Sequence, residues 1–199
     1  MKGRVRSCIL ALCLLFLTGC GENYDTDQNT IFVGRDGKIT ETSVEEMNQS
    51  YYSDAELESF IADEIAAFEG AEGTVEETGF EIADGTATLT LTYTDWKTYA
   101  DFNRRQFYVG TVVKAQAEGY DFQEPFTKVE NGEAVTRDQV LEVPDLKVVI
   151  LETSSNVQLK VPGKIIYVSE KAVAEEKSIA AVEKSQNESI TELAYIIYK

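Results

Sequence analysis

The side chains used most often in catalysis are scarce in this sequence. It contains no histidine and three cysteines among 199 residues. The lack of histidine excludes Ser-His-Asp and Cys-His nucleophilic catalysis and histidine zinc sites. The motifs Gly-x-Ser-x-Gly and Ser-x-x-Lys and a phosphate-binding Gly-rich loop with lysine are absent as well. The chemistry that remains is that of carboxylates, hydroxyls, tyrosines and lysines, and we expect no cofactor.

Paired carboxylates are the one catalytic device that this composition leaves open. Two carboxyl groups at a suitable separation hydrolyse glycosidic bonds, and an apolar setting keeps one of them protonated. The chain has 35 acidic residues, so sequence spacing does not select one pair among them. A carboxylate-dependent cell-envelope or glycan hydrolase therefore stays as an alternative, while a non-catalytic binding or interaction module is the function that we expect.

Two groups of side chains suit a ligand-binding surface. Trp96 and Tyr99 share one side of a predicted helix, where aromatic rings can stack on sugars. Thr88, Thr90 and Thr92 alternate with apolar residues along a predicted strand, which places their hydroxyls on one face of a sheet. Core packing of the aromatic rings and a solvated threonine face explain the same residues, and we favour these simpler interpretations.

An acidic spacing near the N-terminus imitates a calcium loop. Asp25, Asp27 and Asn29 match the opening of an EF-hand loop, but its sixth position is Thr30 and its twelfth is Asp36. An EF-hand has glycine and glutamate at these two places. A solvated linker is therefore the interpretation that we favour, and a calcium-dependent assembly protein is a second alternative.

The first twenty residues carry the most specific signal in the chain. A cationic start with Lys2, Arg4 and Arg6 precedes an apolar run over residues 8–17. A cationic segment, an apolar run of about 7–15 residues and a small-residue processing site are typical of a secretory signal. The apolar run is too short to span a bilayer, which takes about 20 residues.

The sequence Leu17-Thr18-Gly19-Cys20 that ends this run resembles the lipobox of bacterial lipoproteins. The resemblance implies that Cys20 receives a diacylglycerol and becomes the first residue after residues 1–19 are removed. Each buried CH2 contributes about 0.8 kcal/mol, so two acyl chains hold a protein stably on a membrane. We therefore expect a lipid-anchored protein on the extracytoplasmic face of the cell membrane, with residues 20–29 as the lipidated cysteine and a polar tether.

Charge and cysteine content limit the partners of this chain. The leader holds three of the 18 basic residues and none of the 35 acidic ones, so the remainder has a formal net charge of −20. Such a charge repels nucleic acid and anionic headgroups. We expect no nucleic-acid partner, membrane contact through the lipid alone, and an envelope glycan or a protein as partner, with the oligomeric state open. Because Cys8 and Cys13 lie in the leader, a core without disulfides must stabilise the fold.

Hairpins and amphipathic helices dominate the first half of the predicted fold. A turn at residues 35–38 joins strands at residues 30–34 and 39–44, and Asp84-Gly85 joins strands at residues 74–83 and 86–93. Ser53 and Glu56 form a capping box before a helix with apolar residues at helical spacing. Asp95 opens a second helix at residues 96–105, and Thr111 caps a third. Lys114 in the first turn of that third helix also fits an anion site on backbone amides, but the N-cap is the interpretation that we favour.

The second half is predicted to be mostly strands. Residues 120–143 are polar and turn-like, with one short strand near Val140. The apolar run at residues 147–152 predicts a central strand, and residues 193–198 predict a closing strand inside the sheet. Residues 170–186 are compositionally ambiguous, and we weakly favour two strands at residues 172–174 and 179–182.

These patterns predict an α+β fold, with antiparallel sheets, two or three short helices in the first half and a β meander in the second. Residues 30–199 are expected to form a single domain, with a sub-boundary near residues 121–144. The segments 99–103, 109–111 and 194–199 resemble small, acidic, uncharacterised surface lipoproteins of low-GC Gram-positive bacteria. This resemblance implies no particular activity.

Overall fold

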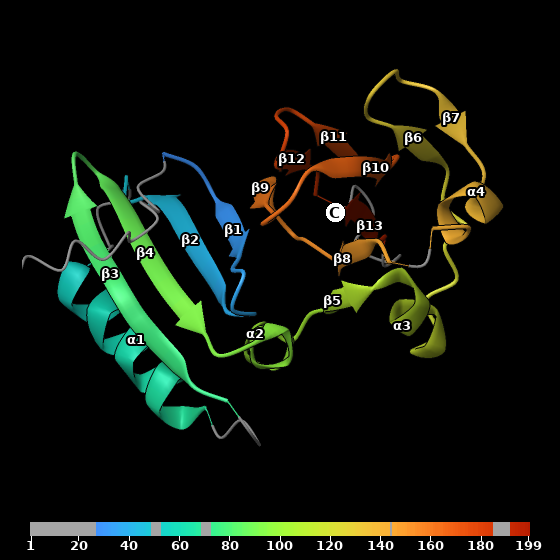
Figure 1. Ribbon diagram of the computed structural model, residues 1–199. Coiled ribbons are helices and arrows are strands. Elements are labelled where there is room, and N and C mark those ends of the chain that lie inside the picture. Colours follow the sequence, from blue (N-terminus) through green and yellow to red (C-terminus); the bar gives the residue numbers. More distant parts are fainter. Residues whose placement is uncertain (1–26, 49–52, 69–72, 144, 185–191) are drawn as a thin grey trace, which may run out of the picture.

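The computed structural model describes residues 27–48, 53–68, 73–143, 145–184 and 192–199. The predicted signal peptide, Cys20 with its lipobox, and Asp25 lie outside these residues. No helix in the described ranges is long and apolar enough to cross a membrane. The described residues form two sheets with helices beside them (Figure 1), which confirms the predicted α+β class.

A seven-stranded sheet, called sheet A here, combines strands from both halves of the chain. Its order is β11-β12-β9-β1-β2-β4-β3. The first half supplies β1 (Thr30–Val33), β2 (Ile39–Glu46), β3 (Val75–Ala83) and β4 (Thr86–Tyr93). The second half supplies β9 (Val157–Lys160), β11 (Ala172–Ala174) and β12 (Ile179–Val182). The halves meet where β1 pairs with β9 in parallel, whereas the other neighbours in this sheet pair antiparallel.

A six-stranded antiparallel sheet, called sheet B here, has the order β5-β8-β13-β10-β6-β7. Its strands are β5 (Phe107–Thr111), β6 (Phe126–Lys128), β7 (Ala134–Val135), β8 (Lys147–Leu151), β10 (Ile165–Ser169) and β13 (Ala194–Tyr198). All five residues of β13 are buried, because this strand has a neighbour on each side and packing on both faces. The predicted central and closing strands are therefore confirmed.

Two apolar cores lie on the two faces of sheet B. The first core contains Ile31 from β1, Leu159 from β9 and Ile196 from β13, so it lies between the two sheets. The second core contains Val148 and Ile197 from sheet B, and α3 and α4 contribute to its cover. Burial of this apolar surface is the main favourable term for a fold that has no disulfide in its described residues.

The described residues form four helices beside the sheets: α1 (Asp54–Ala67), α2 (Trp96–Asn103), α3 (Val112–Ala117) and α4 (Arg137–Leu141). The predicted N-caps are confirmed, because Ser53, Asp95 and Thr111 each accept a backbone N–H from the first turn of their helix. Figure 1 shows α1 lying along β3, while α2 lies between the strands β4 and β5 that it connects.

Two predictions for the second half had different outcomes. The strands expected at residues 172–174 and 179–182 are confirmed as β11 and β12. The strand expected near Val140 is wrong, because Val140 lies in α4 and is buried in the second core. Thr136 and Gln139 form a reciprocal capping box that starts this helix.

The turn between β9 and β10 approaches the C-terminal residue so closely that it requires glycine. Lys164 N donates to Lys199 O at 2.8 Å, and a Cβ on Gly163 would overlap that same carbonyl. We expect Gly163→Ala to lower the free energy of unfolding by about 1–3 kcal/mol, the usual cost of overpacking. Urea unfolding of this variant measures the effect.

Gly79→Ala is the matched control, because its new Cβ would lie 3.6 Å from Thr90 Cβ, an ordinary contact. If Gly163→Ala were as stable as Gly79→Ala, the close approach of this turn to Lys199 would be contradicted.

Candidate functional site

A cleft of about 800 Å3 opens at one end of the two sheets. Its walls come from both: sheet A contributes the turn that follows β1, and sheet B contributes the ends of β5, β8 and β13. The first residues of α2 and the turn at residues 162–163 complete it. We call this hollow the basic cleft, because basic residues outnumber acidic ones in its lining.

An aromatic pair forms one wall of the basic cleft. The ring centroids of Trp96 and Tyr108 lie 4.9 Å apart at an interplanar angle of 62°. Asp95 fixes the start of α2, because its Oδ1 accepts both Thr98 N at 2.8 Å and Thr98 Oγ1 at 2.9 Å. Trp96, the first residue of that helix, is half-buried and packs against both cores.

A glycine on β5 makes room for the second ring of the pair. A Cβ on Gly110 would overlap the phenol ring of Tyr108, so the ring lies across this residue. Burial, then the negative charge of Glu118 and the nearby Tyr120 phenol, raise the pKa of Tyr108. The Tyr108 hydroxyl therefore stays protonated at neutral pH and remains a hydrogen-bond donor.

Positive side chains gather around this aromatic wall. The cleft is lined by five basic residues and two acidic ones. The basic residues are Arg35, Lys97, Lys114, Lys147 and Lys199, and the acidic residues are Glu118 and Asp145. The described residues as a whole contain 15 basic and 30 acidic side chains, so the cleft reverses the charge ratio of its surroundings. None of the five cations has a carboxylate within 4.0 Å among the described residues.

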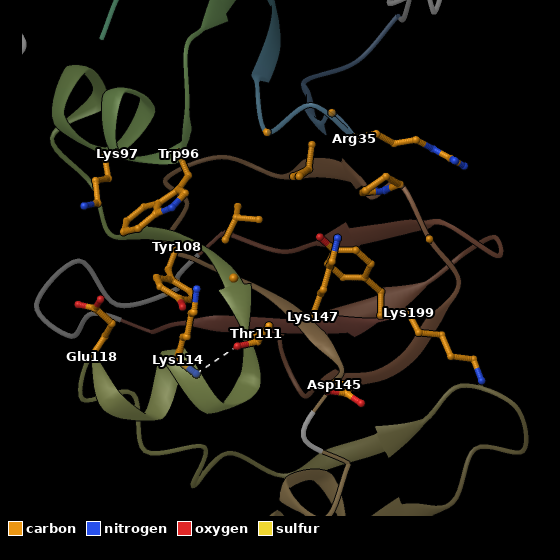
Figure 2. Close-up of a pocket in the computed structure, with 18 residues that line it drawn as sticks. Arg35, Trp96, Lys97, Tyr108, Thr111, Lys114, Glu118, Asp145, Lys147 and Lys199 are labelled. Atoms are coloured by element: carbon orange, nitrogen blue, oxygen red, sulfur yellow. Dashed lines mark hydrogen bonds between the residues drawn. The ribbon is translucent and has the colours of Figure 1, made fainter. Parts of the chain in front are cut away.

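Figure 2 shows how these groups are arranged. Lys147 extends into the middle of the hollow, and Lys114 rises toward Tyr108. Lys97 Nζ stays over the Trp96 ring, 5.6 Å from its centroid. Glu118 and Asp145 lie on separate parts of the rim and do not converge on one point. The cleft can therefore attract an anion, but it holds no acid and base pair.

A second cavity, of about 310 Å3, surrounds a carboxyl group on β2. Glu41 lies on the inner face of sheet A, where Tyr93 Oη donates to its Oε2 at 2.9 Å and Tyr99 Oη donates to its Oε1 at 3.1 Å. Asn103 Nδ2 donates to Tyr93 Oη at 3.3 Å. Arg105 also lines the cavity.

Burial decides the ionisation of this carboxyl group. The Glu41 residue is half-buried overall, but loss of hydration at its carboxyl raises its pKa above the ordinary value of 4.5. The tyrosine hydrogen bonds and the charge of Arg105 lower the pKa but do not outweigh the desolvation. Burial and the nearby Glu41 in turn raise the pKa of both Tyr93 and Tyr99. The cluster is therefore a carboxyl group with a raised pKa beside two phenols whose pKa values are raised as well.

The threonine face lies on the opposite side of sheet A. Thr40 Oγ1 and Thr92 Oγ1 are 3.3 Å apart, and Thr42 Oγ1 and Thr90 Oγ1 are also 3.3 Å apart. Thr40 and Thr42 are buried, whereas Thr90 and Thr92 are half-buried. These hydroxyls therefore bond to one another across the strands, as expected for cross-strand threonine pairs.

The aromatic and threonine residues that the sequence suggested for a ligand surface lie in three different places in the structure. Trp96 lines the basic cleft, Tyr99 belongs to the Glu41 cavity, and Thr88 lies on the far face of sheet A beside Asp27. The sequence did not single out Lys147 or Glu41. One sequence signal could have found Glu41. It follows Ile39 by two residues on a strand, so its carboxyl group lies on the same, otherwise apolar face.

Two of the three predicted calcium ligands, Asp27 and Asn29, lie at the other end of sheet A from the basic cleft. Asp27 and Asn29 line a separate hollow there, and Asn29 Oδ1 accepts Val44 N at 2.8 Å. The described residues contain no group of three acidic, histidine or cysteine side chains placed to hold a metal ion. Since Asp25 lies outside the described ranges, calcium binding stays a prediction.

Comparisons of this chain with protein-family models, with curated proteins and with solved structures found no match. The geometry of the chain itself is therefore the basis for the functional argument.

The Glu41 cluster makes a prediction about stability and pH. Because the pKa of Glu41 is higher in the folded than in the unfolded chain, its proton stabilises the fold below about pH 4.5, and this stabilisation is lost as pH rises through the raised pKa. We expect the free energy of unfolding of the wild type, measured relative to Glu41→Gln, to fall between pH 4 and pH 8. Urea unfolding across this range measures the difference.

Glu45→Gln removes an exposed carboxylate from the same strand and controls for the change in net charge. A difference between wild type and Glu41→Gln that rises with pH would contradict the desolvated setting of Glu41.

Proposed function

We propose that this protein is a lipid-anchored, extracytoplasmic binding module, and that the basic cleft is its ligand site. The observation that carries this proposal is the cleft itself, an open hollow of about 800 Å3 with an aromatic wall and no converging acid and base groups. Ligand clefts commonly have volumes of about 300–1,000 Å3 and combine apolar walls with a few polar groups.

The position of the tether agrees with this role. Asn29 precedes β1 and is fixed to sheet A, because its carbonyl accepts Gln158 N at 2.9 Å. The cleft uses Val33 and Gly34 at the other end of the same strand. A tether that ends at Asn29 therefore reaches the domain on the side away from the cleft. From Cys20 it spans about 30 Å at most, which holds the domain near the membrane with the cleft facing outward.

A carboxylate-dependent hydrolase is the second candidate, and Glu41 favours it. A carboxyl group with a raised pKa in a cavity is the setting of a general acid. Glu45 also lines this cavity. These residues are four apart on one strand, which separates their Cα atoms by about 13 Å. Two glycosidase carboxyls are about 5–9.5 Å apart, so the pair suits this reaction only if the side chains lean together. The binding module is therefore the function that we favour.

The lipid anchor makes a direct prediction. We expect Cys20→Ala to move the protein from the membrane fraction to the soluble extracytoplasmic fraction, because no acyl chain is then attached. Fractionation and immunoblotting of cells that express the full chain measure this change. Cys13→Ala, within the same leader, is the control and should leave the protein on the membrane. A Cys20→Ala protein that stays on the membrane like the control would contradict the anchor.

The cleft as ligand site is tested through its tryptophan. Trp96 is the single tryptophan of the chain, so intrinsic fluorescence reports on the basic cleft directly. We expect at least one envelope oligosaccharide to change Trp96 emission and to raise the melting temperature. A ligand at 100 times its Kd adds about 2.7 kcal/mol to the stability of the fold.

Thr88→Val, on the far face of sheet A, should leave this response unchanged. A melting-temperature rise with constant Trp96 emission would place the ligand elsewhere and contradict the cleft as its site. If the wild type hydrolysed a saccharide and Glu41→Gln did not, the carboxylate-dependent hydrolase would be the supported function in place of the binding module.

A further inference from the structure

The charge of the basic cleft specifies the ligand further than its shape does. The chain without its leader has a net charge of −20, and this charge repels anions at long range. Five of its 15 basic side chains nevertheless line one hollow, where they outnumber the two acidic ones. The cleft is positively charged in a protein whose net charge is negative. Such a cleft favours an anionic ligand that is small enough to stay inside it.

Two of the five cations, Lys114 and Lys147, extend from the junction between β5, β8 and α3. Thr111 at the end of β5 pairs with Lys147 at the start of β8. The same Thr111 caps α3 by accepting Lys114 N at 3.3 Å, and Val112 N donates to Leu146 O at 3.0 Å. These bonds fix the backbones from which Lys114 and Lys147 extend, while both side chains stay exposed. Their ammonium groups are thus available to a ligand at a defined place.

The aromatic wall adds a second requirement. Trp96, Lys97 and Lys114 lie on one side of the hollow, and Lys147 lies nearer its centre (Figure 2). A sugar ring against Trp96 would place an acidic substituent within reach of Lys114 or Lys147. Lysine binds carboxylate and phosphate as a point charge, so either acid group fits this arrangement.

We propose that the basic cleft binds an oligosaccharide that carries carboxylate or phosphate groups, with a sugar ring on Trp96 and an acid group between Lys114 and Lys147. This inference rests on the proposed function. A long nucleic acid fits less well, because it would extend from the cleft over a surface on which acidic side chains outnumber basic ones by 30 to 15 in the described residues.

Three trimers of similar length test the inference: trigalacturonate, a glycerol-phosphate trimer and neutral maltotriose. Titration of residues 20–199 is followed by Trp96 fluorescence and by calorimetry. We expect at least one acidic trimer to bind about tenfold more tightly than maltotriose, and we expect added salt to weaken its binding, since exposed charges are screened. The acidic trimer that binds identifies the source of the negative charge.

The double variant Lys114→Gln/Lys147→Gln should bind this trimer about tenfold more weakly, the combined effect of two exposed ion pairs. Lys177→Gln/Lys184→Gln changes the net charge equally, at exposed residues outside the cleft, and should bind within about twofold of the wild type. Both lysine pairs are exposed, so the variants should keep the melting temperature of the wild type.

The possible failures are distinct. Equal binding of maltotriose and the acidic trimers at Trp96 would overturn the anionic ligand but keep the binding module. Equal losses in the two lysine variants would show a general charge effect and overturn the assignment to the cleft. A single-stranded oligonucleotide that binds more tightly than any saccharide would overturn the saccharide. No change of Trp96 emission with any trimer would overturn the inference, and titration with other envelope oligosaccharides, neutral ones included, then tests the proposed function separately.

Discussion

Much of the structure follows from the parallel pairing of β1 with β9, which joins strands from the two halves of the chain in one sheet. Ile31 pairs with Leu159 at this seam, and both side chains enter the core between the sheets. Parallel neighbours need a long crossover, and here the crossover is the chain from β2 to β8, which includes four strands of sheet B: β5, β6, β7 and β8. The seam therefore sets sheet A against sheet B. It also brings the turn after β1 opposite the ends of β8 and β13, where the cleft opens.

The hollows at the two ends of β1 are lined by side chains of opposite charge. At the end of β1 next to Asn29, a hollow is lined by Asp27, Glu46, Glu175 and Glu183 and by no basic residue. At the other end the basic cleft has more cations than acids. An anion is thus repelled at the Asn29 end of β1 and attracted at the Val33 end. Desolvation of the half-buried Glu41 between these two ends raises its pKa and disfavours its charged form.

Local signals in the sequence predicted most elements of this fold. Asp84 and Gly85 have φ values of 51° and 77° in the hairpin turn that their dipeptide predicts, and Ser53 and Asp95 start helices as N-caps. The α4 helix was missed because its capping box at Thr136 precedes only five helical residues, too few for an amphipathic pattern.

The long-range features were beyond sequence reasoning. No local pattern states that β1 pairs with a strand 128 residues later in the chain, as Thr30 does with Gln158. The cations of the cleft lie at positions 35, 97, 114, 147 and 199, so only the folded chain unites them. Trp96 and Tyr99 share a helix, but the structure directs them to different cavities, because Tyr99 bonds to Glu41 and Trp96 packs on Tyr108.

The most direct test of this account is a map of ligand-induced chemical-shift changes in 15N-labelled residues 20–199 titrated with an acidic trisaccharide. The described structure offers four distinct places: the basic cleft, the Glu41 cavity, the threonine face of sheet A and the hollow lined by Asp27 and Asn29. The account predicts that the largest changes occur at the Trp96 indole N–H and at the backbone amides of Thr111 and Lys147. Changes centred on Thr88, Thr90 and Thr92, or on Glu41 and Tyr99, would contradict it.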